Sequence, residues 1–110
     1  MSQLTTHVLD TALGRPAAGV PVSLLGWASG RWDELGSAVT DGDGRARSLG
    51  PDRVPPGRYR LVFDTAAYFA ATDQVGFHPE VVVVFEVVDD AHYHVPLLLS
   101  PFAYSTYRGS

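Results

Sequence analysis

The fold is decided by the stretch HYHVPLLL, residues 92–99, in which polar and apolar side chains alternate. Alternate side chains of a β-strand point to the same side, so one face would carry His92 and His94. The other face would lie in the core, and it carries Tyr93, Val95, Leu97 and Leu99. Because Pro96 cannot donate a ladder hydrogen bond, it predicts an edge strand or a bulge at this point.

The same two-residue period recurs upstream in short runs separated by frequent glycine and proline. Residues 58–64 place Tyr59, Leu61 and Phe63 on one face, as expected of a half-buried strand. Further strands are predicted at residues 5–10, 20–27, 32–40, 79–88 and 102–107, and turns at 14–19 and 41–44. Because residues 79–88 are apolar on both faces, we expect that strand to be central in its sheet or to have both of its faces covered. Short, regularly spaced strands predict an all-β antiparallel sandwich or barrel.

One helix is predicted, at residues 65–72, where alanine is frequent. A length of 110 residues fits a single domain spanning 1–110. Because a domain this small buries only about two thirds of its unfolded surface, we expect oligomerisation to add stability.

The composition excludes several classes of function. Hydrophobic residues make up 45% of the chain and charged residues 18%, which is typical of a folded protein. The net charge is −4 and the sequence has no basic stripe, so we expect no nucleic-acid partner. The absence of cysteine excludes disulfides and thiolate metal sites. The longest apolar run, residues 81–85, is too short to span a bilayer, and no secretory signal is visible. We therefore expect a soluble, cytoplasmic protein.

The end of the chain carries an unusual concentration of polar chemistry. Residues 104–110, YSTYRGS, hold two tyrosines, three hydroxyl side chains from Ser and Thr, an arginine and a glycine beside a free carboxylate. They follow shortly after His92 and His94. Chain ends are usually frayed unless they are tied down, so this composition predicts a site.

Each candidate side chain also has an ordinary interpretation. His92 and His94 can be metal ligands, surface decoration or an acid–base pair, but a third metal ligand with clear spacing is missing. His7, alone in its strand, fits a structural role, and Arg45 and Arg108 fit solvated surface positions. Residues 41–44, DGDG, lack the full calcium-loop pattern and predict a plain turn.

Taken together, these segments resemble the 5-hydroxyisourate hydrolases, the transthyretin-related enzymes of urate degradation. The resemblance spans nearly the whole chain, through LTTHVLD at 4–10, GRPA at 14–17, GRY at 57–59, HYHVPLLLSP at 92–101 and STYRGS at 105–110. The final YRGS separates these hydrolases from transthyretin, the hormone carrier of the same fold. One departure is His78, which stands where the family usually has an aromatic residue.

The resemblance implies a transthyretin-like antiparallel β-sandwich of two four-stranded sheets with one short helix. It also implies a homotetramer, a dimer of dimers with active sites at the dimer–dimer interface. The implied reaction opens the N1–C6 amide of 5-hydroxyisourate and gives 2-oxo-4-hydroxy-4-carboxy-5-ureidoimidazoline. No cofactor and no metal are implied.

The resemblance also implies roles for individual residues. The catalytic set is His7, Arg45, His94 and Ser110. One histidine would activate water and the other would orient it or protonate the leaving nitrogen, in an order that stays open. Arg45 would bind the substrate's oxygens and the developing oxyanion. Substrate would also contact Thr106 and Tyr107, and the supporting residues are His92, Arg108 and Gly109.

Two other functions fit the same segments. A transthyretin-like carrier would bind a small, thyroid-hormone-like ligand without catalysis, but a carrier has no need of paired imidazoles. A bare sandwich module would instead pair a sheet edge with a partner protein. Thyroxine binding without hydrolysis would favour the carrier, and a stable monomer with inert histidines would favour the module.

Overall fold

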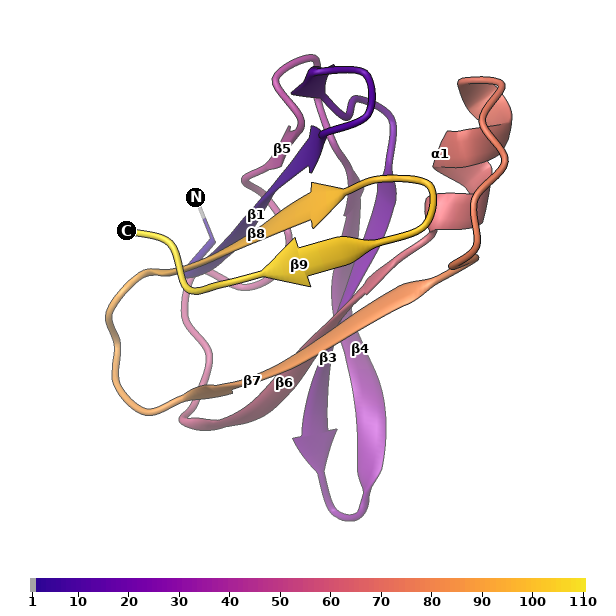
Figure 1. Ribbon diagram of the computed structural model, residues 1–110. Helices are drawn as coiled ribbons and strands as arrows, with labels where there is room; N and C mark the ends of the chain where they lie inside the picture. Colours follow the sequence, from indigo (N-terminus) through magenta and orange to yellow (C-terminus); the bar gives the residue numbers. More distant parts are fainter. Residues whose placement is uncertain (1) are drawn as a thin grey trace.

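The computed structural model describes residues 2–110 as two β-sheets with one short helix (Figure 1). The first sheet has the strand order β4-β3-β6-β7. Its strands are β3 (Pro21–Ala28), β4 (Arg31–Val39), β6 (Gly57–Phe63) and β7 (Val81–Val87). The second sheet has the order β2-β1-β8-β9, with β5 paired to β1. Its strands are β1 (Leu4–Asp10), β2 (Arg15–Pro16), β5 (Arg45–Ala46), β8 (Tyr93–Leu99) and β9 (Tyr104–Thr106).

The core lies between the two sheets and follows the predicted alternation. On β6 the buried side chains are Tyr59, Leu61 and Phe63, as expected. On β8 they include Tyr93, Val95, Leu97 and Leu99, also as expected. Both sets belong to one continuous cluster of buried apolar residues. Because each fully buried aliphatic or aromatic side chain contributes about 1.5–3 kcal/mol, this cluster holds the sheets together.

The predicted sandwich with one short helix is confirmed, and the strand pairing adds detail. The expectation of two four-stranded sheets is wrong for the second sheet, which has five strands because two short strands, β2 and β5, both pair with β1. The pair β1–β8 is parallel, with Thr5 opposite His94, whereas the other strand pairs formed by residues 2–110 are antiparallel. A parallel pair needs a crossover connection, and here the whole first sheet lies between β1 and β8 in the chain.

The prediction that Pro96 marks an edge strand is wrong, because β8 lies between β1 and β9. Because Pro96 has no backbone N–H, the hydrogen-bond ladder between β8 and β9 is interrupted at this residue. Antiparallel pairing with β9 runs from Leu99 to Leu97, stops at Pro96, and resumes as one isolated bridge between His94 and Gly109. In place of a backbone donor, the Thr106 hydroxyl donates to the Pro96 carbonyl at 2.7 Å.

The prediction of a central strand at residues 79–88 is wrong, and within this chain the strand is covered on one face only. β7 is the edge strand of its sheet. Val81, Val83 and Val87 are buried, whereas Val82 and Val84 are exposed on the other face. Valine favours strands at exposed positions as well, so an apolar run on both faces does not by itself show that both faces are covered.

The helix α1 (Thr65–Ala71) confirms the predicted segment. The Asp64 side chain caps it by accepting a hydrogen bond from the Ala67 N–H at 3.0 Å. On its buried side, the Tyr68 hydroxyl donates to the Asp10 carboxylate at the end of β1, at 2.6 Å. Gln74 donates to the same carboxylate at 3.0 Å. No helix within residues 2–110 is long and apolar enough to cross a membrane.

Candidate active site

Three neighbouring strands bring the candidate residues onto one face of the five-stranded sheet. Thr5 and His7 lie two residues apart in β1 and therefore share a face. Thr5 pairs with His94 of β8, and His7 pairs with Arg45 of β5. Side chains of paired residues project to the same side, so these four form one polar group. The ring centroids of His7 and His94 are 6.4 Å apart.

The turn before β5 positions Arg45. The Asp41 carboxylate accepts hydrogen bonds from the backbone N–H groups of Asp43 and Arg45, at 2.9 and 3.0 Å. Gly44 has a φ of 76°, and a Cβ at this residue would collide with the Val8 carbonyl oxygen. Glycine therefore lets the turn pack directly on β1, where the Val8 N–H donates to the Gly44 carbonyl at 2.7 Å. The predicted turn at residues 41–44 is confirmed.

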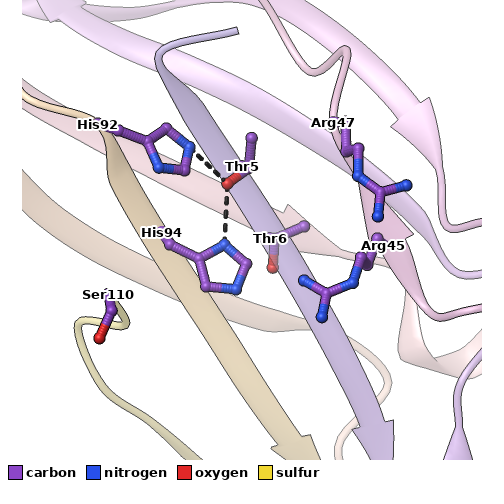
Figure 2. A pocket seen from close by; sticks show the side chains of 7 residues that line it. All are labelled: Thr5, Thr6, Arg45, Arg47, His92, His94 and Ser110. Carbon is purple, nitrogen blue, oxygen red and sulfur yellow. Dashed lines mark hydrogen bonds between the residues drawn. The ribbon is translucent and has the colours of Figure 1, made fainter. Parts of the chain in front are cut away.

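The site contains a cavity of about 210 Å³ (Figure 2). In Figure 2 the Arg45 guanidinium points toward the His94 ring, and Ser110 lies on the opposite side of that ring. Two guanidinium groups and two imidazole rings therefore line one cavity. The lining residues are Thr5, Thr6, Arg45, Arg47, His92, His94 and Ser110.

The Thr5 hydroxyl lies between two imidazole rings. Its Oγ1 is 2.9 Å from His92 Nε2 and 2.8 Å from His94 Nδ1 (Figure 2). The two rings stack with centroids 6.2 Å apart. Because His94 is bonded to Thr5 through Nδ1, its Nε2 is the ring nitrogen left for chemistry.

The surroundings of His94 favour its neutral form. Burial lowers the pKa of His94 below its usual 6.5, and electrostatic interactions with Arg45, His92 and His7 lower it further. A neutral imidazole at neutral pH can accept a proton, so His94 has the properties of a general base.

His7 is placed differently from His94. Its Nε2 lies 2.8 Å from the Asp43 carbonyl oxygen. A carbonyl only accepts hydrogen bonds, so His7 carries a proton on Nε2 and this nitrogen is committed to the turn. Although its ring lies near His94, His7 does not line the cavity.

The last residues are tied to β8. The Gly109 N–H donates to the His94 carbonyl at 2.8 Å. A Cβ at Gly109 would lie 2.7 Å from His94 Cδ2, so only glycine fits against this ring. The Arg108 guanidinium carbon lies 4.2 Å from the centroid of the Tyr93 ring, a cation–π contact. These contacts bring Ser110 to the cavity.

Two predicted substrate contacts lie elsewhere in this chain. Thr106 and Tyr107 line a second cavity of about 220 Å³, together with Arg108 and side chains of β7 and β8. The structure therefore brings Arg45, His94, His92 and Ser110 together, sets His7 beside them, and leaves Thr106 and Tyr107 apart.

Sequence reasoning missed Thr5, Thr6 and Arg47. Their positions in the sequence carried a weak signal: Thr5 is two residues before His7, and Arg47 two residues after Arg45. The meeting of Thr5 with His94 depends on the parallel pairing of strands whose paired residues are 89 positions apart. Alternation within single strands does not predict that pairing.

The chemistry available at the site is that of water addition to a carbonyl. A neutral imidazole can take a proton from water, and guanidinium groups can bind a developing oxyanion. Among residues 2–110 there is no group of three or more His, Asp or Glu side chains placed to hold a metal ion.

Comparison with known proteins gives a consistent result. The model of the HIUase/Transthyretin family matches residues 4–109. A mouse protein named 5-hydroxyisourate hydrolase is 48% identical, over 99% of this chain and 96% of its own. The structure of Klebsiella pneumoniae 5-hydroxyisourate hydrolase superposes with a TM-score of 0.87 at 37% identity, covering 97% of this chain and 98% of that one. Sea bream transthyretin in complex with thyroxine superposes with a TM-score of 0.91 at 35% identity, covering 97% and 94%.

Proposed function

The chain belongs to the HIUase/Transthyretin family, and from this premise we propose that it hydrolyses 5-hydroxyisourate in urate degradation. The observation that carries the proposal is the cavity in which the His94 imidazole, with its lowered pKa, faces the Arg45 guanidinium. A carrier of an apolar ligand would not need a proton acceptor beside two cations. The likeness to hydrolases of nearly the same length supports the same conclusion.

The proposed reaction begins with proton transfer to His94. Its Nε2 takes a proton from water as the water oxygen bonds to C6 of the substrate. The resulting oxyanion at C6 is stabilised by Arg45, whose guanidinium presents several donors in a fixed plane. The C6–N1 bond then breaks and N1 receives the proton that His94 took from water, which restores the neutral imidazole, and the new carboxylic acid loses a proton to solvent to give the ring-opened carboxylate. We assign the base to His94 rather than His7, because His7 Nε2 is bonded to the Asp43 carbonyl.

Ser110 and His7 have supporting roles in this proposal. The Ser110 hydroxyl, which lines the cavity, would orient the attacking water. The electrostatic interaction with His7 helps to lower the pKa of His94. Replacement of Arg45 by lysine would keep a positive charge but lose the planar fork of donors, and we expect activity to fall.

We also propose that the 110 residues form one domain that assembles as a homotetramer in the cytoplasm. Large apolar side chains are exposed on β7 and the tail, including Val84 at 54%, Phe102 at 71% and Tyr107 at 56%. Exposed groups of this kind mark interaction surfaces. In a tetramer, Thr106 and Tyr107 would contact substrate at a site shared with another subunit. Sedimentation velocity should give four times 11.8 kDa, and a monomer at assay concentration would contradict this.

The test of function is the decay of 5-hydroxyisourate, generated from urate by urate oxidase, with and without the protein. The compound absorbs ultraviolet light and decays spontaneously, so the two rates can be compared directly. We expect acceleration proportional to protein concentration. Unchanged decay together with thyroxine binding would instead support a carrier; the sea bream transthyretin structure is a complex with thyroxine.

A further inference from the structure

Thr5 makes two hydrogen bonds that together limit where protons can lie. Its side chain is only 4% exposed, and its Oγ1 contacts His92 Nε2 and His94 Nδ1 at 2.9 and 2.8 Å. A hydroxyl has a single proton. Because Thr5 Oγ1 has no other hydrogen-bond partner among residues 2–110, its proton goes to one of these nitrogens, and the other nitrogen then donates to a lone pair of the hydroxyl oxygen.

Only one of the two arrangements leaves His94 able to act as a base. If His94 Nδ1 carries a proton and donates to Thr5, then Thr5 donates to His92 Nε2, and His94 Nε2 holds a lone pair toward the cavity. If His92 Nε2 carries the proton, the Thr5 hydroxyl turns to His94 Nδ1. A neutral His94 then carries its proton on Nε2 and cannot accept one from water.

We propose that Thr5 is a positioning residue that couples the proton position on His92 to the tautomer of His94. In the active form the hydrogen bonds run from His94 Nδ1–H to Thr5 Oγ1–H and on to His92 Nε2. When His94 gains a proton on Nε2, these hydrogen bonds keep their directions, so the Thr5 hydroxyl need not turn during the reaction. Protonation of His92 reverses the direction of both hydrogen bonds, and His94 can then no longer act as a base. The catalytic consequence rests on the function proposed above, whereas the coupling itself does not.

Other charged groups lie around His94. They act on it through their electrostatic field rather than through the hydrogen bonds that run by way of Thr5. His7 lies near it on β1, Arg45 lines the cavity from β5, and Arg47 lines it from the segment after β5. None of these groups is hydrogen-bonded to Thr5 among the contacts of residues 2–110. Their charges shift the titration of His94 but do not dictate which nitrogen holds the proton.

The first test is an NMR titration of the ¹⁵N-histidine-labelled wild-type protein, which needs no substrate. The ring ¹⁵N shifts and two-bond couplings report the tautomer of each histidine. At neutral pH we expect both His92 and His94 to carry their proton on Nδ1. As His92 is protonated, the neutral His94 population should move its proton to Nε2. A His94 ring that keeps the Nδ1 proton throughout the titration of His92 would overturn the coupling.

The second test compares substitutions at Thr5. Thr5→Val keeps the shape and removes the hydroxyl, and Thr5→Ser restores it. We expect Thr5→Val to lose the Nδ1–H preference of His94 and to lower kcat about 10²-fold with little change in KM, because correct placement of a general base has this order of effect. Thr5→Ser should recover most of both. Wild-type tautomers and kcat in Thr5→Val would contradict the proposal.

Thr40→Val is the matched control. Thr40 is buried like Thr5 but does not line the cavity, and its hydroxyl donates to the Ala17 carbonyl, at 2.7 Å, rather than to an imidazole. It should lower stability as Thr5→Val does, yet leave the tautomer of His94 unchanged. If Thr5→Val does not fold, the wild-type titration still decides the question. If the wild type shows coupled tautomers but no hydrolysis, the proposed function fails and the coupling stands.

Discussion

The strand β1 carries two polar clusters, one near each end. The first borders an open cavity, whereas the second is buried and fully hydrogen-bonded. Near its start, Thr5 contacts His92 and His94 beside an open cavity. At its end, Asp10 is only 1% exposed and accepts four hydrogen bonds. Their donors are the Tyr68 hydroxyl, the Gln74 side chain and the backbone N–H groups of Ala12 and Leu13.

The two clusters differ in how firmly they hold their charge. Burial would raise the pKa of Asp10, but the hydrogen bonds from Tyr68, Leu13, Gln74 and Ala12 outweigh burial and hold it below its usual value. Asp10 therefore stays charged and serves structure. The lowered pKa of His94 leaves it neutral, with one nitrogen open to the cavity. We call the cluster around Asp10 saturated, because its carboxylate accepts hydrogen bonds from four donors, and such a cluster stabilises the fold. We call the cluster around His94 open, because one ring nitrogen has no hydrogen-bond partner among residues 2–110 and can exchange a proton.

The largest expected effect is at the open cluster. His94→Asn removes the proposed base, and turnover should fall about 10²–10⁴-fold, the usual contribution of general base catalysis. The thermal midpoint should move little, because the ring lines a cavity. Steady-state decay of 5-hydroxyisourate and a melting curve would measure both. His78→Asn, far from the cavity, is the control, and equal losses in the two variants would refute the assignment.

A smaller effect is expected from Gly109→Ala. The added methyl would meet the His94 ring, at 2.7 Å from Cδ2, so either the ring or the tail must move. We expect kcat to fall about tenfold, less than the roughly 10²–10⁴-fold contribution of general base catalysis, because the base is displaced rather than removed. Gly42→Ala is the control, because nothing lies within 4 Å of a Cβ at that residue. Unchanged kcat in Gly109→Ala would show that tail packing does not set the position of His94.

At the saturated cluster, Tyr68→Phe should change stability and leave activity alone. Removing one donor from the buried Asp10 carboxylate should cost about 1–3 kcal/mol in the free energy of unfolding. Urea denaturation measures this, with Tyr104→Phe, at an exposed tyrosine, as the control. A loss of kcat in the folded Tyr68→Phe protein would show that the two clusters are not independent.

The pH dependence of Tyr68→Phe has a definite sign. The pKa of Asp10 in the folded protein is below its usual value of 3.8 in an unfolded chain, so its stabilisation is present above about pH 4 and is lost as pH falls through the folded pKa. Tyr68→Phe weakens the bonds that lower this pKa. Its acid unfolding should therefore begin at a higher pH than in the wild type.

The smallest effect concerns the acid limb of the pH–rate profile. Protonation of His94 removes the base, and its pKa is below 6.5, so activity should persist under mildly acidic conditions and fall only below that value. A profile of kcat/KM measures the midpoint. A midpoint above 6.5 would mean that another group titrates, or that His94 is not the base.

Much of the fold follows from alternation within single strands. The two-residue period predicts the buried faces of β6 and β8, and the glycine and aspartate at residues 41–44 predict the turn before Arg45. The same local pattern misleads at Val82 and Val84, which are apolar but lie on an exposed face of an edge strand. Local sequence cannot distinguish an exposed valine on an edge strand from a covered one.

The site was only partly predictable for a different reason. Arg45, His94 and Ser110 line one cavity, as the resemblance to the hydrolases implies. The contact of Thr5 with two histidines arises from strand order, which is a property of the whole chain. Thr106 and Tyr107 lie at a separate cavity because the tail passes along the other side of β8.

The parallel pairing of β1 with β8 has a consequence for biosynthesis. During translation β1 leaves the ribosome early, but its neighbour β8 is made almost ninety residues later. Closing so long a loop is entropically costly, and pairings between distant segments slow folding. The candidate site therefore cannot form before β8 has been synthesised. Recovery of enzymatic activity would accordingly report completion of folding in this protein, because no earlier intermediate can contain the finished site.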